Sequence, residues 1–134
     1  MEKRKVLIAD DEIDMRIFLK TLLETSGYQP FITRDGREGL KKAREVIPDL
    51  IILDVMMPGE SGSQTYRQLK TDSELAHIPV IMLSGVKRDS FFHYLKMLNA
   101  RAGGDIPLPA AYFEKPVKHT DLIAAIQTIL EPEV

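Results

Sequence analysis

The stretch Leu50–Gly62, LIILDVMMPGESG, decides the fold that the rest of the chain has to fit. Its first four residues are apolar and run without a break into Asp54. An uninterrupted apolar run of this length is typical of a strand buried on both faces, as in a parallel sheet. A proline and glycines then predict a turn, and the pair Ser61 and Gln64 has the spacing of a capping box that begins a helix. The sequence therefore places a carboxylate at the carboxyl end of a central strand.

Two interpretations of Asp54 follow from this stretch alone. In open α/β sheets, ligands bind at the edge where the strands reach their carboxyl ends, which favours a functional carboxylate. Aspartate is also a common turn residue, so Asp54 could simply cap the turn that follows the strand. The remainder of the chain has to decide between these interpretations.

Short apolar runs and helical repeats alternate along the rest of the chain. We predict further strands over residues 6–9, 29–33, 78–83 and 110–113, in addition to residues 50–54. Apolar residues at three- and four-residue spacing predict helices around residues 15–23, 35–47, 62–71, 89–100 and 121–130. This alternation favours an α/β fold of the flavodoxin-like class. We expect a doubly wound, five-stranded parallel sheet in the order 2-1-3-4-5, with helices on both faces.

Composition limits the function classes that this chain can serve. Its 134 residues fit one domain over residues 1–134, and its net charge of −2 gives no basic surface for nucleic acid. There is no cysteine, which excludes a disulfide framework and a thiol nucleophile. No apolar run approaches the roughly 18 residues of a membrane span, and the start lacks the apolar region of a signal peptide. We therefore expect a cytoplasmic protein that binds neither membranes nor nucleic acid directly.

Polar side chains follow four of the predicted strands. Asp10 and Asp11 follow the first strand, Asp54 ends the third, Ser84 follows the fourth and Lys115 follows the fifth. Because the carboxyl ends of parallel strands meet at one edge of the sheet, we expect these side chains to lie close together. The sequence therefore predicts a site of three carboxylates, one hydroxyl and one ammonium group.

This set of side chains suits phosphoryl transfer. Clustered carboxylates repel one another, and a hard cation such as Mg²⁺ would balance them together with Lys115. We expect Asp10, Asp11 and Asp54 to hold Mg²⁺, with the backbone carbonyl of Met56 within reach of the same ion. A neutralised site of this kind can accept a phosphoryl group, with Asp54 as the nucleophile. The Ser84 hydroxyl would then bind a phosphoryl oxygen.

As a set, these residues resemble the receiver domain of the bacterial two-component response-regulator family. The motifs that carry the resemblance are Asp10-Asp11, Asp54-Val-Met-Met-Pro-x-x-x-Gly62, Ser84-Gly85 and Lys115-Pro116, in that order along essentially the whole chain. The resemblance implies that Asp54 accepts a phosphoryl group from a phosphohistidine on a sensor histidine kinase or a histidine phosphotransfer protein. It also implies a signalling switch that assists its own phosphorylation and dephosphorylation, rather than an enzyme with an external substrate.

The resemblance also implies how the switch would act. Ser84 would move toward the phosphoryl group and Tyr112 would rotate inward behind it. That movement would reshape the surface of the helix at 89–100, the strand at 110–113 and the last helix, through which a homodimer could form. Residues 100–111 depart from the family because they replace a short turn by a longer, irregular connection with two glycines and two prolines. We predict that this connection packs over the helix or the strand and shapes the output surface; a tolerated insertion is the alternative.

Three other functions fit the residues less well. A phosphohydrolase with an aspartate nucleophile would resemble Asp-x-Asp-x-Thr after the first strand, where this chain has DDEID at residues 10–14. A nucleotide- or flavin-binding module would need a glycine-rich first loop in the same place. A degenerate receiver that only binds partners would not need the acidic pair or Lys115. The three histidines lack the spacing of a metal site or a catalytic triad; they are His77, His93 and His119.

Overall fold

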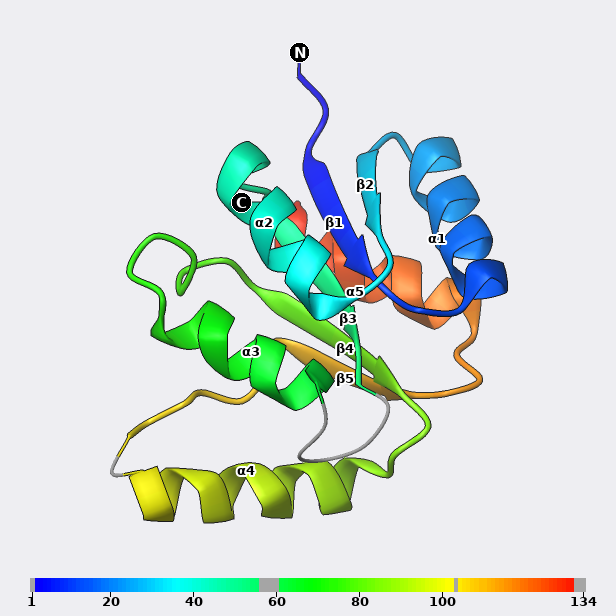
Figure 1. Cartoon of the computed structure of the whole chain (residues 1–134). Coiled ribbons are helices and arrows are strands. Elements are labelled where there is room, and N and C mark those ends of the chain that lie inside the picture. Colours follow the sequence, from blue (N-terminus) through cyan, green and yellow to red (C-terminus); the bar gives the residue numbers. More distant parts are fainter. Residues whose placement is uncertain (1, 56–60, 103, 132–134) are drawn as a thin grey trace.

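One parallel sheet of five strands forms the centre of the molecule, as Figure 1 shows. The computed structural model of the chain describes residues 2–55, 61–102 and 104–131. The strands are β1 (Lys5–Ala9), β2 (Gln29–Thr33), β3 (Leu50–Asp54), β4 (Val80–Ser84) and β5 (Ala111–Glu114). The helices are α1 (Ile13–Thr25), α2 (Gly36–Val46), α3 (Ser61–Thr71), α4 (Arg88–Ala102) and α5 (His119–Leu130). The strand order β2-β1-β3-β4-β5 confirms the predicted fold.

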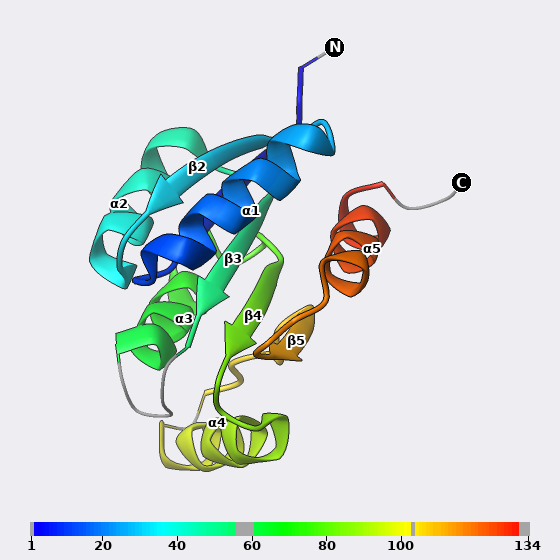
Figure 2. The ribbon, with the colours of Figure 1, turned by 90° about the vertical axis from the view of Figure 1, so that its right-hand side faces the viewer.

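Two separate cores lie on the two faces of the sheet. Successive side chains of a strand point to opposite faces. Leu7 and Ile51 accordingly join a core with residues of α2, α3 and α4, whereas Ile8 and Ile52 join a core with residues of α1 and α5. In Figure 2, α2 and α3 lie on one side of the sheet and α5 lies on the other. Since the central strand β3 is buried along its whole length, it can hold Asp54 rigidly at its carboxyl end.

Some element boundaries differ from the prediction by one or two residues. The fourth strand begins at Val80 rather than at residue 78, because the Ile78 amide donates to the Leu75 carbonyl in a turn (3.0 Å). Pro79 separates that turn from the strand, and proline has no amide to donate to a sheet. The helix predicted at residues 89–100 extends over Arg88–Ala102. None of these shifts changes which residues reach the carboxyl edge of the sheet.

The N-cap of α2 yields a test of local stability. The Asp35 side chain accepts a hydrogen bond from the Glu38 amide at 2.8 Å. Replacing Asp35 by Ala should lower the free energy of unfolding by about 1 kcal/mol, because the amide loses its partner at the helix start. Urea denaturation measures this change. Asp35→Asn keeps an acceptor oxygen and serves as the control; an equal loss in both variants would contradict a capping role.

The connection between α4 and β5 is anchored to the helices beside it. The Asn99 side chain donates to the Ile106 carbonyl (3.1 Å) and accepts from the Ile106 amide (2.9 Å). The Tyr66 hydroxyl on α3 donates to the Pro107 carbonyl at 2.5 Å. Ile106 is buried in the core beneath α4, so the predicted packing of this connection is confirmed there. Leu108, by contrast, is 59% exposed.

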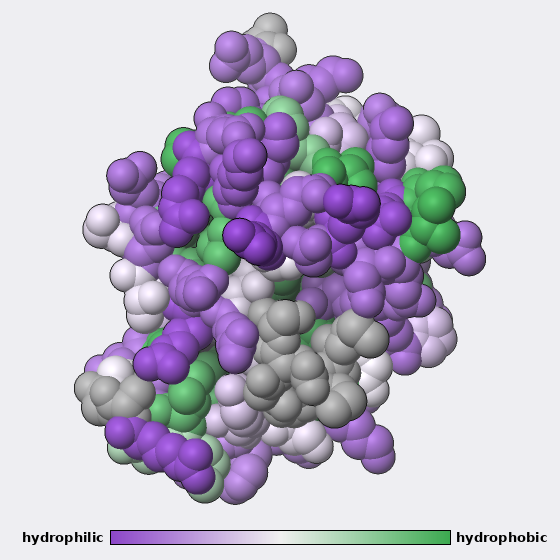
Figure 3. Space-filling model, viewed as in Figure 1, coloured by the Kyte–Doolittle hydropathy of each residue, from purple (hydrophilic) through white to green (hydrophobic). Residues whose placement is uncertain are grey.

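The surface of the molecule is mainly polar on the face drawn in Figure 3. Apolar side chains interrupt it in a few places, one of them over α1, where Ile13 and Ile17 are exposed. Among the described residues, no helix has both the length and the apolar character needed to cross a membrane.

Candidate functional site

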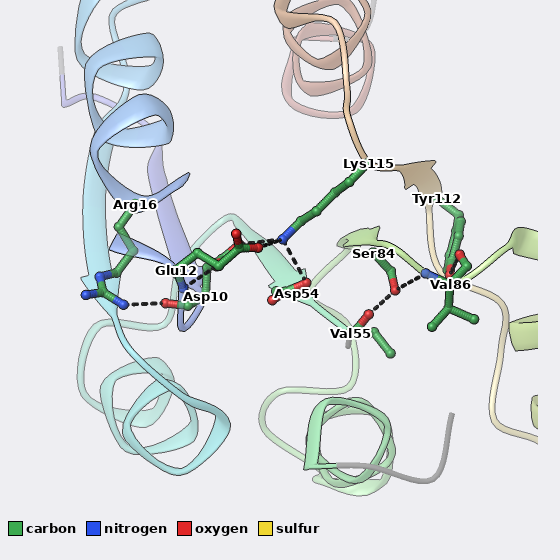
Figure 4. A network of polar contacts seen from close by, with 9 residues as sticks. All are labelled: Asp10, Glu12, Arg16, Asp54, Val55, Ser84, Val86, Tyr112 and Lys115. Carbon is green, nitrogen blue, oxygen red and sulfur yellow. Dashed lines mark hydrogen bonds and ion pairs between the residues drawn. The ribbon is translucent and has the colours of Figure 1, made fainter. Parts of the chain in front are cut away.

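Four of the predicted polar residues meet at the carboxyl edge of the sheet in Figure 4, namely Asp10, Asp54, Ser84 and Lys115. Lys115, which follows β5, reaches back across the ends of the strands toward β3 and β1. Its Nζ atom lies 3.2 Å from Asp54 Oδ1 and 3.5 Å from Asp10 Oδ2. The same atom lies 2.6 Å from Glu12 Oε1. A single ammonium group therefore bridges three carboxylates.

Asp10 is held rigidly at the end of β1. The residue is 2% exposed, and the Glu12 amide donates to its Oδ1 atom at 2.8 Å. The Arg16 guanidinium donates to the Asp10 carbonyl at 2.8 Å, and the Asp10 amide donates to the Thr33 carbonyl at 3.2 Å. Backbone and side chain are thus both fixed, which orients the remaining carboxylate oxygen toward Lys115.

The acidic side chains have the composition of a cation site. Asp10, Asp11, Glu12 and Asp54 can each place one carboxylate oxygen within 4.8 Å of the others. The Oδ2 atom of Asp54 is buried and has no hydrogen-bond partner among the described residues. A buried, unpartnered carboxylate oxygen beside further oxygen donors fits a hard cation such as Mg²⁺. Met56, which was expected to add its carbonyl, lies outside the described residues.

Sequence reasoning missed Glu12 as a member of this cluster. The resemblance draws attention to the acidic pair before it, and nothing in the pattern of residues 10–14 tells which way the Glu12 side chain points. The one available signal was a third consecutive carboxylate after β1. Its position beside Lys115 depends on the return of the chain 103 residues later.

Burial and mutual repulsion shift the protonation of the cluster. Burial, and then the charge of Asp10, raise the pKa of Asp54 from 3.8 to about 6, although Lys115 opposes this shift. Burial likewise raises the pKa of Asp10. Burial disfavours the charge on Lys115, but the hydrogen bond to Glu12 and the charges of Asp54 and Asp10 outweigh it and raise the pKa of Lys115 to about 12. The site therefore holds excess negative charge that an added cation would relieve.

Ser84 and Tyr112 lie behind the carboxylates. The Ser84 hydroxyl is fully buried, donates to the Val55 carbonyl and accepts from the Val86 amide at 3.0 Å. The Tyr112 hydroxyl donates to the Val86 carbonyl at 2.6 Å. The Tyr112 ring stacks on the Phe91 ring, with 5.4 Å between the ring centroids. Tyr112 is only 3% exposed, so its ring is already on the inside of the molecule in this arrangement.

The sequence pattern of the response regulator receiver domain matches residues 6–127, which include every described residue of the site. The chain belongs to this family. Receiver domains serve two-component signalling, in which they interact with histidine kinases and with output partners. The match favours the receiver hypothesis over a phosphohydrolase and over a nucleotide- or flavin-binding module.

Curated relatives and solved structures are similar to this receiver domain over almost its whole length. The polar-differentiation response regulators DivK of Brucella anthropi and Brucella abortus are each 37% identical over 132 residues, covering 97% of this chain and 98% of theirs. The chemotaxis response regulator CheY4 of Vibrio cholerae superposes with a TM-score of 0.78 at 27% identity, covering 96% of this chain and 100% of its own. A receiver domain of a histidine kinase from Syntrophus aciditrophicus superposes with a TM-score of 0.75 at 29% identity. The match covers 98% of this chain and 95% of that domain.

Proposed function

We propose that this receiver domain is a switch that accepts a phosphoryl group on Asp54 from the phosphohistidine of a sensor histidine kinase or a histidine phosphotransfer protein. The observation that carries the proposal is the state of the Asp54 carboxylate. One oxygen lies 3.2 Å from the Lys115 ammonium, and the other is buried without a partner among the described residues. A carboxylate held in this way is poised to gain a substituent rather than to support the fold.

The proposed reaction needs few groups. An Asp54 oxygen attacks phosphorus, the nitrogen–phosphorus bond of the donor breaks, and the imidazole leaves with the electron pair. Lys115 offsets the charge that the phosphoryl oxygens bring to the site. Asp10, Asp11 and Asp54 would hold Mg²⁺, which supplies further neutralisation of that charge. The proposal involves no external substrate, so the domain acts as a signalling protein.

The proposed output runs from Ser84 to α4. Ser84 and Tyr112 are joined through the two backbone groups of Val86, and the Tyr112 ring stacks on Phe91 of α4. A new hydrogen bond from Ser84 to the phosphoryl group would replace its bond to the Val55 carbonyl and disturb this chain of contacts. The surface of α4, β5 and α5 would then present a different face to a downstream protein, an output domain or a second copy. The exposed Leu108 makes the α4–β5 connection part of that surface.

Acetyl phosphate with Mg²⁺, followed by measurement of the intact mass, tests the proposed function. The wild-type chain should gain the mass of one phosphoryl group, and Asp54→Asn should gain none because its amide is not a nucleophile. Asp105→Asn, at an exposed position on the α4–β5 connection, is the matched control and should be modified like the wild type. Equal modification of Asp54→Asn and the wild type would refute the assignment.

A further inference from the structure

Among the described residues, Glu12 makes the shortest polar contact of Lys115. The distance from Lys115 Nζ to Glu12 Oε1 is 2.6 Å, compared with 3.2 Å to Asp54 and 3.5 Å to Asp10. Figure 4 shows the Glu12 carboxylate meeting the end of the lysine side chain. In the unmodified domain, the ammonium group is therefore held more closely by Glu12 than by the proposed phosphoryl acceptor.

The backbone of Glu12 explains why its side chain can take this position. Its amide donates to Asp10 Oδ1 at 2.8 Å, and its carbonyl accepts from the Arg16 amide at 3.0 Å, so the main chain is fixed at the start of α1. Glu12 is the N-cap of α1, yet its side chain makes no capping hydrogen bond. Serine, threonine, aspartate or asparagine would serve better as a cap. The Glu12 side chain is instead directed across the site to Lys115.

Exposure separates Glu12 from the other two partners of Lys115. The Glu12 side chain is 60% exposed, whereas those of Asp54 and Asp10 are 4% and 2% exposed. Glu12 can therefore return to water without an unpaired buried charge being left behind, which neither of the others can do. This makes Glu12 the partner that Lys115 can exchange when a phosphoryl group arrives.

We propose that Glu12 is a positioning residue that restrains Lys115 and slows its engagement with a phosphoryl group on Asp54. The inference rests on the proposed phosphorylation of Asp54. Glu12 and the phosphoryl oxygens would compete for the same ammonium group, so the close contact with Glu12 at 2.6 Å has to weaken before Lys115 can move fully toward the phosphoryl oxygens. Exchange of an ion pair whose carboxylate is largely exposed corresponds to a modest barrier, which suits a residue that adjusts the rate of a reaction and does not perform it.

Two substitutions separate contact from charge. Glu12→Ala removes both the charge and the contact with Lys115. Glu12→Asp keeps the charge, but its side chain is one methylene too short to make the same contact. With acetyl phosphate and saturating Mg²⁺, both variants should be modified about two- to fivefold faster than the wild type, the change expected from one such pair. Asp14→Ala removes a carboxylate from the same first turn of α1 and should leave the rate unchanged.

An equilibrium measurement provides a second readout. The dissociation constant of beryllofluoride, a phosphoryl mimic followed by fluorine NMR, should fall by a similar factor in both Glu12 variants. Rates and affinities equal to those of the wild type would overturn the inference while leaving Asp54 as the acceptor. If Glu12→Ala were modified faster than the wild type and Glu12→Asp at the wild-type rate, the inference would also be overturned. The charge at position 12, and not its contact with Lys115, would then set the rate. Absence of modification in the wild type would overturn the proposed function, and this inference with it.

Discussion

Replacing Asp54 by Asn should raise the free energy of unfolding by about 3 kcal/mol at pH 7.5 in metal-free buffer. The pKa of Asp54 is raised from 3.8 to about 6, mainly by burial and then by Asp10. At pH 7.5 the folded domain must keep this carboxylate charged against that preference, and asparagine removes the cost with little change of shape. A residue proposed as the phosphoryl acceptor is thus expected to lower the stability of the fold that holds it.

The stabilisation by Asp54→Asn should depend on pH. Between about pH 4 and pH 6, unfolded chains have released the Asp54 proton while the folded domain retains it, so rising pH destabilises the wild-type fold. The stabilisation by asparagine should therefore be small near pH 4 and reach its full size above about pH 6. Urea denaturation across this range, with a chelator present, measures it. Asp105→Asn is the control, and an equal gain at pH 4 and pH 7.5 would point to packing instead of charge.

Replacing Lys115 by Ala should strengthen the binding of Mg²⁺ on the order of tenfold or more, because a positive charge leaves the immediate surroundings of the carboxylates. The same variant should lose the response to beryllofluoride, since the phosphoryl oxygens lose their ammonium partner. Lys115 contacts Asp54, Asp10 and Glu12, so the effect draws on all three of these carboxylates.

Mg²⁺ titrations followed by thermal denaturation can measure this change, because a ligand that binds the folded state raises the melting temperature. Lys20→Ala, an exposed lysine on α1, controls for the loss of one positive charge elsewhere. Unchanged or weaker Mg²⁺ binding in Lys115→Ala would place the cation away from this cluster. Asp10→Asn combined with Asp11→Asn should abolish the stabilisation by Mg²⁺.

The sheet was predictable because its signals are local. The uninterrupted apolar run before Asp54 is typical of a strand covered on both faces, and alternation with amphipathic helices then leaves few topologies. That topology was enough to bring Asp10, Asp54, Ser84 and Lys115 to one edge. Their residue types and strand positions needed no knowledge of side-chain conformation.

The parts that sequence reasoning missed depend on side chains meeting across long separations. Glu12 turns away from the helix that it begins because Lys115 returns to the same place much later in the chain. The packing of Tyr112 depends on where the Val86 carbonyl and the Phe91 ring lie. The hydroxyl of Ser84 could have pointed to Asp54, but the Val55 carbonyl and the Val86 amide bind it instead.

Few side chains of the described residues bind the α4–β5 connection, so this segment could be transferred to a related receiver. Within the described residues, Asn99 and Tyr66 are the two side chains that bind its backbone, at Ile106 and Pro107. A related receiver given residues 99–110 together with a tyrosine at the position of Tyr66 would carry both of these side chains, and its own core would have to accept Ile106. Such a chimera would transfer the exposed Leu108 without altering the carboxylates. Recognition by downstream partners could then be exchanged between receivers while the proposed phosphorylation chemistry stays the same.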